Sequence, residues 1–141
     1  MGKWFGFAVA AAVLYALHQV FTKLAASRIG DGLGALLVEA TAAVSVLAYL
    51  GWLWFGGGWN QQFTPAGATY SVLTGICVGS GTVVFFLMFQ RGGPLSAVPA
   101  ILAAGAAMMA LAGVLFFREQ LSLSRSLGIV LSIVGLYLLR K

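Results

Sequence analysis

The residues best suited to chemistry in this sequence are the few ionisable side chains that lie inside long apolar stretches. Glu39 is the main one, since its neighbours include Leu36, Leu37, Val38 and Val44. An ionised carboxyl among apolar side chains is costly unless it has a polar partner, water or a bound molecule. We therefore expect Glu39 to line a polar cavity. The alternative is a structural carboxyl that hydrogen-bonds a neighbouring helix or is hydrated near the protein surface.

A second group of polar residues precedes Glu39. Tyr15, His18, Gln19 and Thr22 recur at spacings of three and four, so they share one face of a helix. Such a face turns toward a cavity or another helix. Histidine changes charge nearer to neutral pH than other side chains, so His18 is a candidate to carry a proton or to pair with Glu39. The alternative is a hydrogen-bonded packing residue.

The sequence offers no catalytic constellation. It holds three acidic residues, one histidine and one cysteine, scattered over separate segments. Glu39 and His18 give two metal ligands without a third, so no metal site is expected. No glycine-rich loop carries a lysine for phosphate. We therefore expect a protein that is not an enzyme and has no cofactor.

The hydrophobic pattern of the sequence predicts which helices hold these residues. Of the 141 residues, 61% are hydrophobic and 8% are charged. About 20 mostly apolar residues cross a bilayer as a helix, and five blocks reach that scale. They cover residues 4–25, 33–55, 68–89, 95–117 and 123–139. The pattern predicts one all-α, multi-pass integral membrane domain over residues 1–141, placed in the inner or plasma membrane.

The charges support this interpretation and bear on orientation. The net charge of +5 comes from Lys and Arg residues near the block ends rather than from a basic patch, so no nucleic-acid partner is expected. With five spans, three of these cations fall on the N-terminal side of the bilayer and five on the other side. This weak bias favours a cytoplasmic C-terminus, but it could let both orientations insert.

Small residues mark two of the predicted spans. Gly75 and Gly79 form a GxxxG pair beside Ser80, a pattern typical of close helix packing, although the same residues could line a cavity. Pro99 lacks an amide proton, so it is a candidate hinge in the fourth span. On the fifth span the small residues are Gly128, Ser132 and Gly135.

The last 50 residues carry a more specific signal. From Gly92 the chain reads GGPLSAVPAILAAGAAMMALAGVLFFREQLSLSRSLGIVLSIVGLYLLRK, and this resembles the end of an EamA-type repeat of the drug/metabolite transporter superfamily. The residues that carry the resemblance are Gly93, Pro94, Ser96, Pro99, Phe116, Phe117, Glu119, Ser124, Arg125, Gly128, Ile129 and Gly135. Glu39 matches no motif of the family, so its role rests on physical arguments.

The resemblance implies a function and an assembly. Most family members carry two such repeats, and this chain is similar to the half-length members with one. Transport in this family implies a site between two inverted repeats near the bilayer midplane. We therefore expect an antiparallel homodimer of dual topology, with a parallel homodimer as the alternative. The dimer contact is expected at Gly128, Ser132 and Gly135, as resemblance to smaller multidrug relatives suggests.

These observations predict a secondary transporter or exporter of a small metabolite. It would work by alternating access within the lipid bilayer and be proton-coupled through Glu39. One alternative is a flippase subunit that moves a lipid-linked head group. Another is a non-transporting membrane scaffold that pairs with a full transporter.

Overall fold

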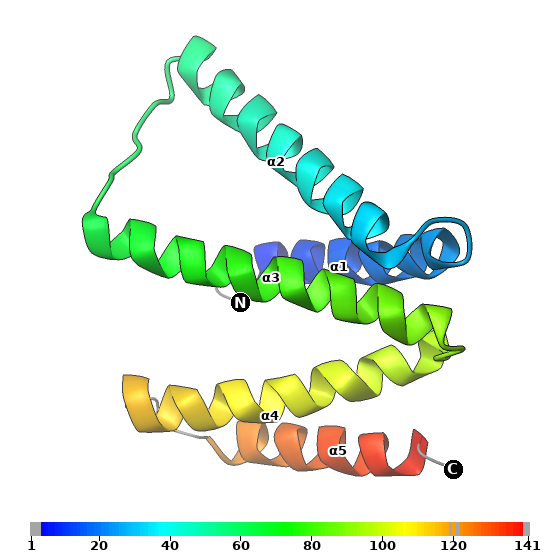
Figure 1. Ribbon diagram of the computed structural model, residues 1–141. Helices are drawn as coiled ribbons and strands as arrows, with labels where there is room; N and C mark the ends of the chain where they lie inside the picture. The colour runs from blue at the N-terminus through cyan, green and yellow to red at the C-terminus, as the bar shows by residue number, and fades with distance from the viewer. Residues whose placement is uncertain (1–3, 119, 121, 140–141) are drawn as a thin grey trace. The chain divides into compact units, whose positions relative to one another are not determined.

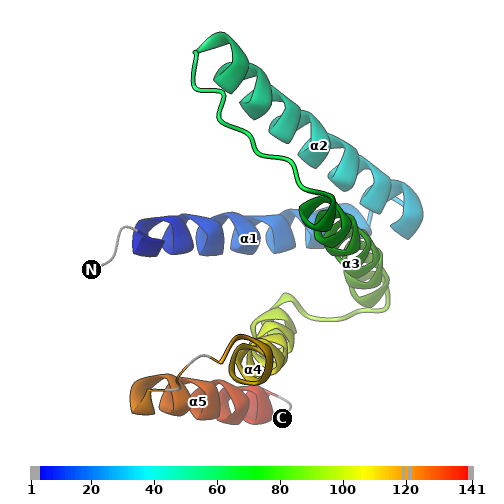
Figure 2. The same cartoon turned by 90° about the vertical axis from the view of Figure 1, so that its left-hand side faces the viewer.

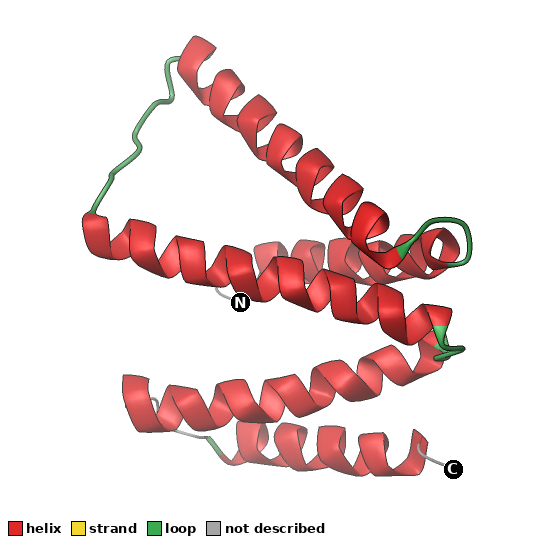
Figure 3. Cartoon of the chain, in the orientation of Figure 1, coloured by secondary structure: helices red, strands yellow, loops and turns green. Residues whose placement is uncertain are grey.

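The computed structural model describes residues 4–118, 120 and 122–139, and these are folded almost entirely as helix (Figure 1, Figure 3). The helices are α1 (Trp4–Ala26), α2 (Asp31–Phe55), α3 (Pro65–Gln90), the short 3-10 helix η1 (Leu95–Ala97), α4 (Val98–Phe117) and α5 (Leu123–Leu139). The chain divides into two compact units. The first ends at Gly92 and the second begins at Gly93.

Four segments are long and apolar enough to cross a membrane: α1, α2, α3 and the stretch Leu95–Phe117, with 23, 25, 26 and 23 residues. Between 6% and 17% of their most apolar windows is buried inside the protein. Helices that hide so few of their apolar side chains need lipid or another apolar partner around them. The prediction of an all-helical membrane protein is confirmed for these four segments, and α5, with 17 residues, is shorter.

The helix ends follow from local sequence. Asp31 occupies the first turn of α2, where a negative charge is favourable beside the exposed amides. The side chain of Thr64 caps α3 by accepting a hydrogen bond from the Gly67 amide at 3.1 Å. Pro65 then occupies the first helical position, where a missing amide proton costs nothing. Consequently α2 and α3 begin before residues 33 and 68, where the hydrophobic pattern places their starts.

The first unit is held together at one end. Phe86 of α3 is fully buried and lies against Gly34 of α2, and the space that a side chain at residue 34 would need is filled by the Phe86 ring. At the tip of the unit, the Gln90 side-chain amide donates to the carbonyl of Ile29 at 3.0 Å. Glycine at residue 34 is therefore what lets α2 and α3 approach closely.

The three helices of this unit converge at that end and splay apart at the other (Figures 1 and 2). The Lys23 ammonium also lies 5.1 Å from the centre of the Phe89 ring, which ties α1 to α3. The buried residues of α1, α2 and α3 all belong to the converging halves: Gln19, Thr22, Ala26, Gly34, Ala35, Thr82, Phe86 and Phe89. The other halves of these helices carry exposed apolar side chains.

The second unit is the pair α4 and α5 with η1 before it. The two helices run antiparallel and pack side by side (Figures 1 and 2). Pro99 lies in the first turn of α4, directly after η1, so its missing amide proton removes no bond from the helix interior. The helix α4 ends at Phe117, and Arg118, which follows it, has a φ of 52° in the left-handed region.

Candidate functional site

Glu39 is joined to α3 by a single short hydrogen bond. The Thr82 hydroxyl donates to Glu39 Oε1 at 2.6 Å. Thr82 is 4% exposed, whereas Glu39 is half-buried. The carboxyl group is thus attached to the core of the first unit, while part of its surface remains open.

The Thr82 hydroxyl has two acceptors within reach. Besides Glu39, the carbonyl of Val78 lies 3.0 Å from the same oxygen. A hydroxyl carries one proton and two lone pairs, so Thr82 can donate to only one of them at a time. When Glu39 is ionised, the proton is directed to the carboxylate. When Glu39 is protonated, the carboxyl proton can be donated to Thr82, whose own proton turns to Val78.

This arrangement lets Glu39 gain and lose a proton without breaking the link between α2 and α3. Both protonation states keep one hydrogen bond between the two helices. The Thr82 hydroxyl can therefore serve as a hydrogen-bond partner of Glu39 in either protonation state.

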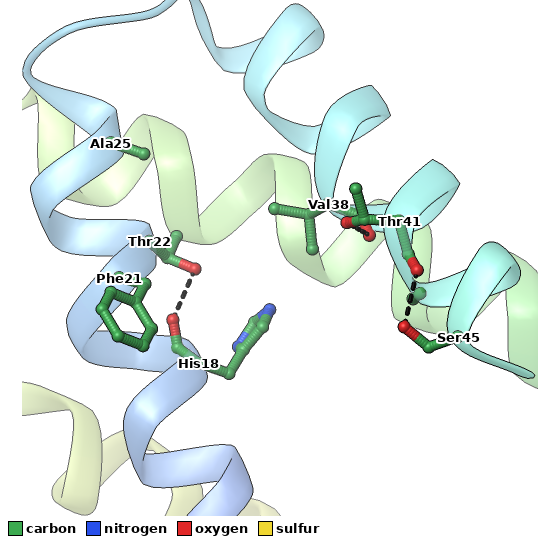
Figure 4. Close-up of a pocket in the computed structure, with 8 residues that line it drawn as sticks. His18, Phe21, Thr22, Ala25, Val38, Thr41 and Ser45 are labelled. Atoms are coloured by element: carbon green, nitrogen blue, oxygen red, sulfur yellow. Dashed lines mark hydrogen bonds between the residues drawn. The ribbon is translucent and has the colours of Figure 1, made fainter.

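A cavity of about 380 Å³ lies between α1 and α2. One face of each helix lines it, with the same spacing of three, four and seven residues on both sides (Figure 4). The lining residues are His18, Phe21, Thr22, Ala25, Val38, Thr41, Ala42 and Ser45. The imidazole of His18 extends from α1 into the space facing α2 (Figure 4), and its Nδ1 atom is buried with no hydrogen-bond partner.

The polar groups of α1, α2 and α3 lie at one level. His18 is eight residues before the end of α1, Glu39 eight residues after the start of α2, and Thr82 eight residues before the end of α3. Eight residues correspond to about 12 Å along a helix. These three helix ends are held together by a short turn and by the bond from Gln90 to Ile29. The polar side chains therefore form one layer across the first unit.

The four polar residues predicted on α1 have different environments. His18 and Thr22 line the cavity, and the Thr22 hydroxyl donates to the His18 carbonyl at 2.8 Å. Tyr15 is 64% exposed, and its ring meets the His18 ring edge-on at 6.5 Å between centroids. Gln19 is 6% exposed, and its Oε1 atom has no hydrogen-bond partner. Glu39 does not line the cavity; its bond runs to Thr82 on α3.

The glycines singled out on α3 and α5 have open space where a side chain would lie. A side chain added at Gly75, Gly79, Gly128 or Gly135 would meet nothing within 4 Å, so these glycines are not used for close packing among the described residues. Ser80 is exposed. Their roles in helix packing and dimer contact stay predictions. The side chain of Ser132, and Glu119 from the family resemblance, lie outside the described residues.

Sequence reasoning missed three contributors to this site. Thr41 and Ser45 belong to an apolar block, but they fall on the same helical face as Val38, which is a signal that the spacing contains. Thr82 stands among small residues in α3, and no pattern in the sequence pairs it with Glu39. The pairing depends on the rotation of α3 against α2, which the fit of Phe86 on Gly34 determines.

Four long apolar helices that are able to cross a membrane, with a few polar side chains among them, are typical of an integral membrane protein. The model of the EamA-like transporter family matches residues 2–141. The chain therefore belongs to this family of small-molecule membrane transporters and contains one such domain, as a half-length member does. No curated protein and no solved structure matches it significantly.

Proposed function

We propose that this chain is one half of a secondary transporter of a small metabolite in the inner or plasma membrane. Two copies, inserted in opposite orientations, supply the two inverted repeats that the family's mechanism needs. The polar layer of the first unit is the substrate site, and Glu39 carries the coupling proton. Alternating access then moves the layer between the two sides of the membrane.

One observation carries this proposal: the carboxyl of Glu39, within an apolar helix, is bonded to a hydroxyl that can serve both of its protonation states. The exposed apolar surface of α1 to α4 supports the second copy, because a partner would cover part of it.

The test of coupling uses purified protein in vesicles that enclose a pH-sensitive dye. A panel of amines, amino acids, sugars and organic acids is added outside, and proton movement is followed. Glu39→Gln keeps the shape and an oxygen acceptor but cannot exchange a proton, so we expect it to abolish the response. The matched control is Asp31→Asn, which removes the same charge from the first turn of the same helix and should leave the response intact.

The result can contradict the proposal in two ways. If Glu39→Gln moves protons as fast as the unaltered protein, Glu39 is not the coupling group. If no compound on the panel elicits a response from the unaltered protein, a non-transporting scaffold becomes the better account.

The antiparallel assembly has a separate test. In a variant with Cys77 replaced by Ser, one new cysteine is placed in the loop after α2 and labelled with a membrane-impermeant reagent from each side. Dual insertion gives labelling from both sides. Labelling from one side only would contradict it and favour a parallel pair.

A further inference from the structure

The hydroxyl groups that line the cavity donate their protons to hydrogen bonds within their own helices. Each hydroxyl has one proton to donate, and here each is bonded to a backbone carbonyl of its own helix. Thr22 donates to the His18 carbonyl at 2.8 Å, and Thr41 to the Leu37 carbonyl at 2.8 Å. Ser45 donates to the Thr41 carbonyl at 2.9 Å. All three oxygens therefore offer only lone pairs to a ligand.

His18 is the remaining polar side chain that lines the cavity, and it does not change the excess of hydrogen-bond acceptors over donors. The neutral imidazole of His18 has one donor and one acceptor, and its buried Nδ1 is unpartnered. The lining contains no lysine, arginine or side-chain amide. Hydrogen-bond acceptors thus outnumber donors, and nothing in the wall carries a fixed positive charge.

We propose that the cavity takes a primary ammonium compound with a short apolar body, an inference that rests on the proposed transport function. A primary ammonium has three N–H donors, and the hydroxyl oxygens of Thr41 and Ser45, one turn apart on α2, offer lone pairs to two of them. The small apolar side chains of Ala25, Val38 and Ala42 suit a hydrocarbon chain. About 380 Å³ lies near the lower end of ligand pockets, so the ligand is small.

The same wall disfavours anions. A carboxylate or phosphate needs donors for its oxygens, and a neutral His18 supplies one at most. The hydroxyls could donate only by giving up their bonds to the helix backbone.

The experiment compares three probes of one size with the full chain in detergent: butylammonium, 1-butanol and butyrate. Binding at neutral pH is measured by ligand-observed NMR titration. We expect butylammonium to bind most tightly. Thr41→Val and Ser45→Ala each remove one acceptor and should weaken its binding about tenfold, as expected for a hydrogen bond to a charged group.

Two controls separate loss of the site from loss of the fold. Thr41→Ser keeps the hydroxyl and should keep the affinity. Thr69→Val removes a hydroxyl that is likewise bonded to its own helix, at Pro65, but lies on α3 outside the cavity. It should bind butylammonium as the unaltered protein does.

The outcomes distinguish this inference from the transport proposal. Butylammonium that binds in detergent but drives no proton movement in vesicles supports the ligand class and counts against transport. Butyrate that binds as tightly as butylammonium, or an affinity unchanged by both Thr41→Val and Ser45→Ala, overturns the ligand class. Transport of other compounds in vesicles would then stand by itself.

Discussion

Replacing Thr82 with valine tests the hydrogen bond on which the proposed coupling depends. Valine has nearly the same shape as threonine, so the substitution removes the hydroxyl and little else. It takes away the donor that lies 2.6 Å from Glu39 and leaves the carboxyl without its partner on α3. Since Thr82 is 4% exposed, water cannot readily replace the lost hydroxyl.

The loss of stability expected for Thr82→Val can be estimated from the energies of comparable hydrogen bonds. Hydrogen bonds to charged groups contribute about 1.5 to 3 kcal/mol in soluble proteins. Bonds between membrane helices average about 0.6 kcal/mol, with an upper value of about 1.7. Because the Glu39 to Thr82 bond is short and one partner is buried, we expect about 1.5 kcal/mol, or roughly a tenfold change in the folding equilibrium.

The assay is unfolding of the purified protein in mixed micelles, followed by circular dichroism as a denaturing detergent is added. Thr82→Ser keeps a hydroxyl and should retain most of the stability. Thr74→Val is the matched control, because the Thr74 hydroxyl on the same helix is exposed and donates only to the Tyr70 carbonyl. The reasoning is refuted if Thr82→Val is as stable as the unaltered protein, or if Thr74→Val loses as much.

Two further predictions concern the contacts that hold the first unit. Gly34→Ala places a methyl group in the space filled by the Phe86 ring and should destabilise the protein by about 1 to 3 kcal/mol. Gly51→Ala on the same helix is the control, because its methyl group meets open space. Equal stabilities of the two variants in the detergent titration would contradict the close approach of α2 and α3. Thr64→Ala removes the side chain that caps the Gly67 amide, and it should lower the stability of the protein by about 1 kcal/mol and speed hydrogen exchange at that amide. Unchanged exchange would show that the cap is not needed.

Hydrophobicity was enough to locate the long helices but not their first turns. The cost of exposing backbone groups to lipid makes any long apolar block a helix, so the spans follow from composition. Asp31 and Pro65 lie outside the apolar blocks, yet both belong to helices because each suits the first turn. The close fit of Gly34 and Phe86 could not be predicted, since it depends on which faces of α2 and α3 meet.

The candidate site was predictable in part. An ionisable residue inside an apolar span is conspicuous, so Glu39 and His18 stand out from the sequence alone. The hydroxyl partner at Thr82 is not conspicuous, because serine and threonine are common in membrane helices and usually bond to their own backbone. Which hydroxyl reaches across to another helix depends on helix rotation, and that is a property of the packed unit.

The contacts among α1, α2 and α3 lie near one end of the first unit, so most of α2 extends beyond them. From Glu39 to Phe55 the helix continues for 16 residues, or about 24 Å, beyond the contacts that pin it. A tilt of about 10° around those contacts would carry its far tip about 4 Å, while the pinned turn scarcely moves. Small rearrangements near Glu39 would thus be amplified into a larger displacement at the far end of α2.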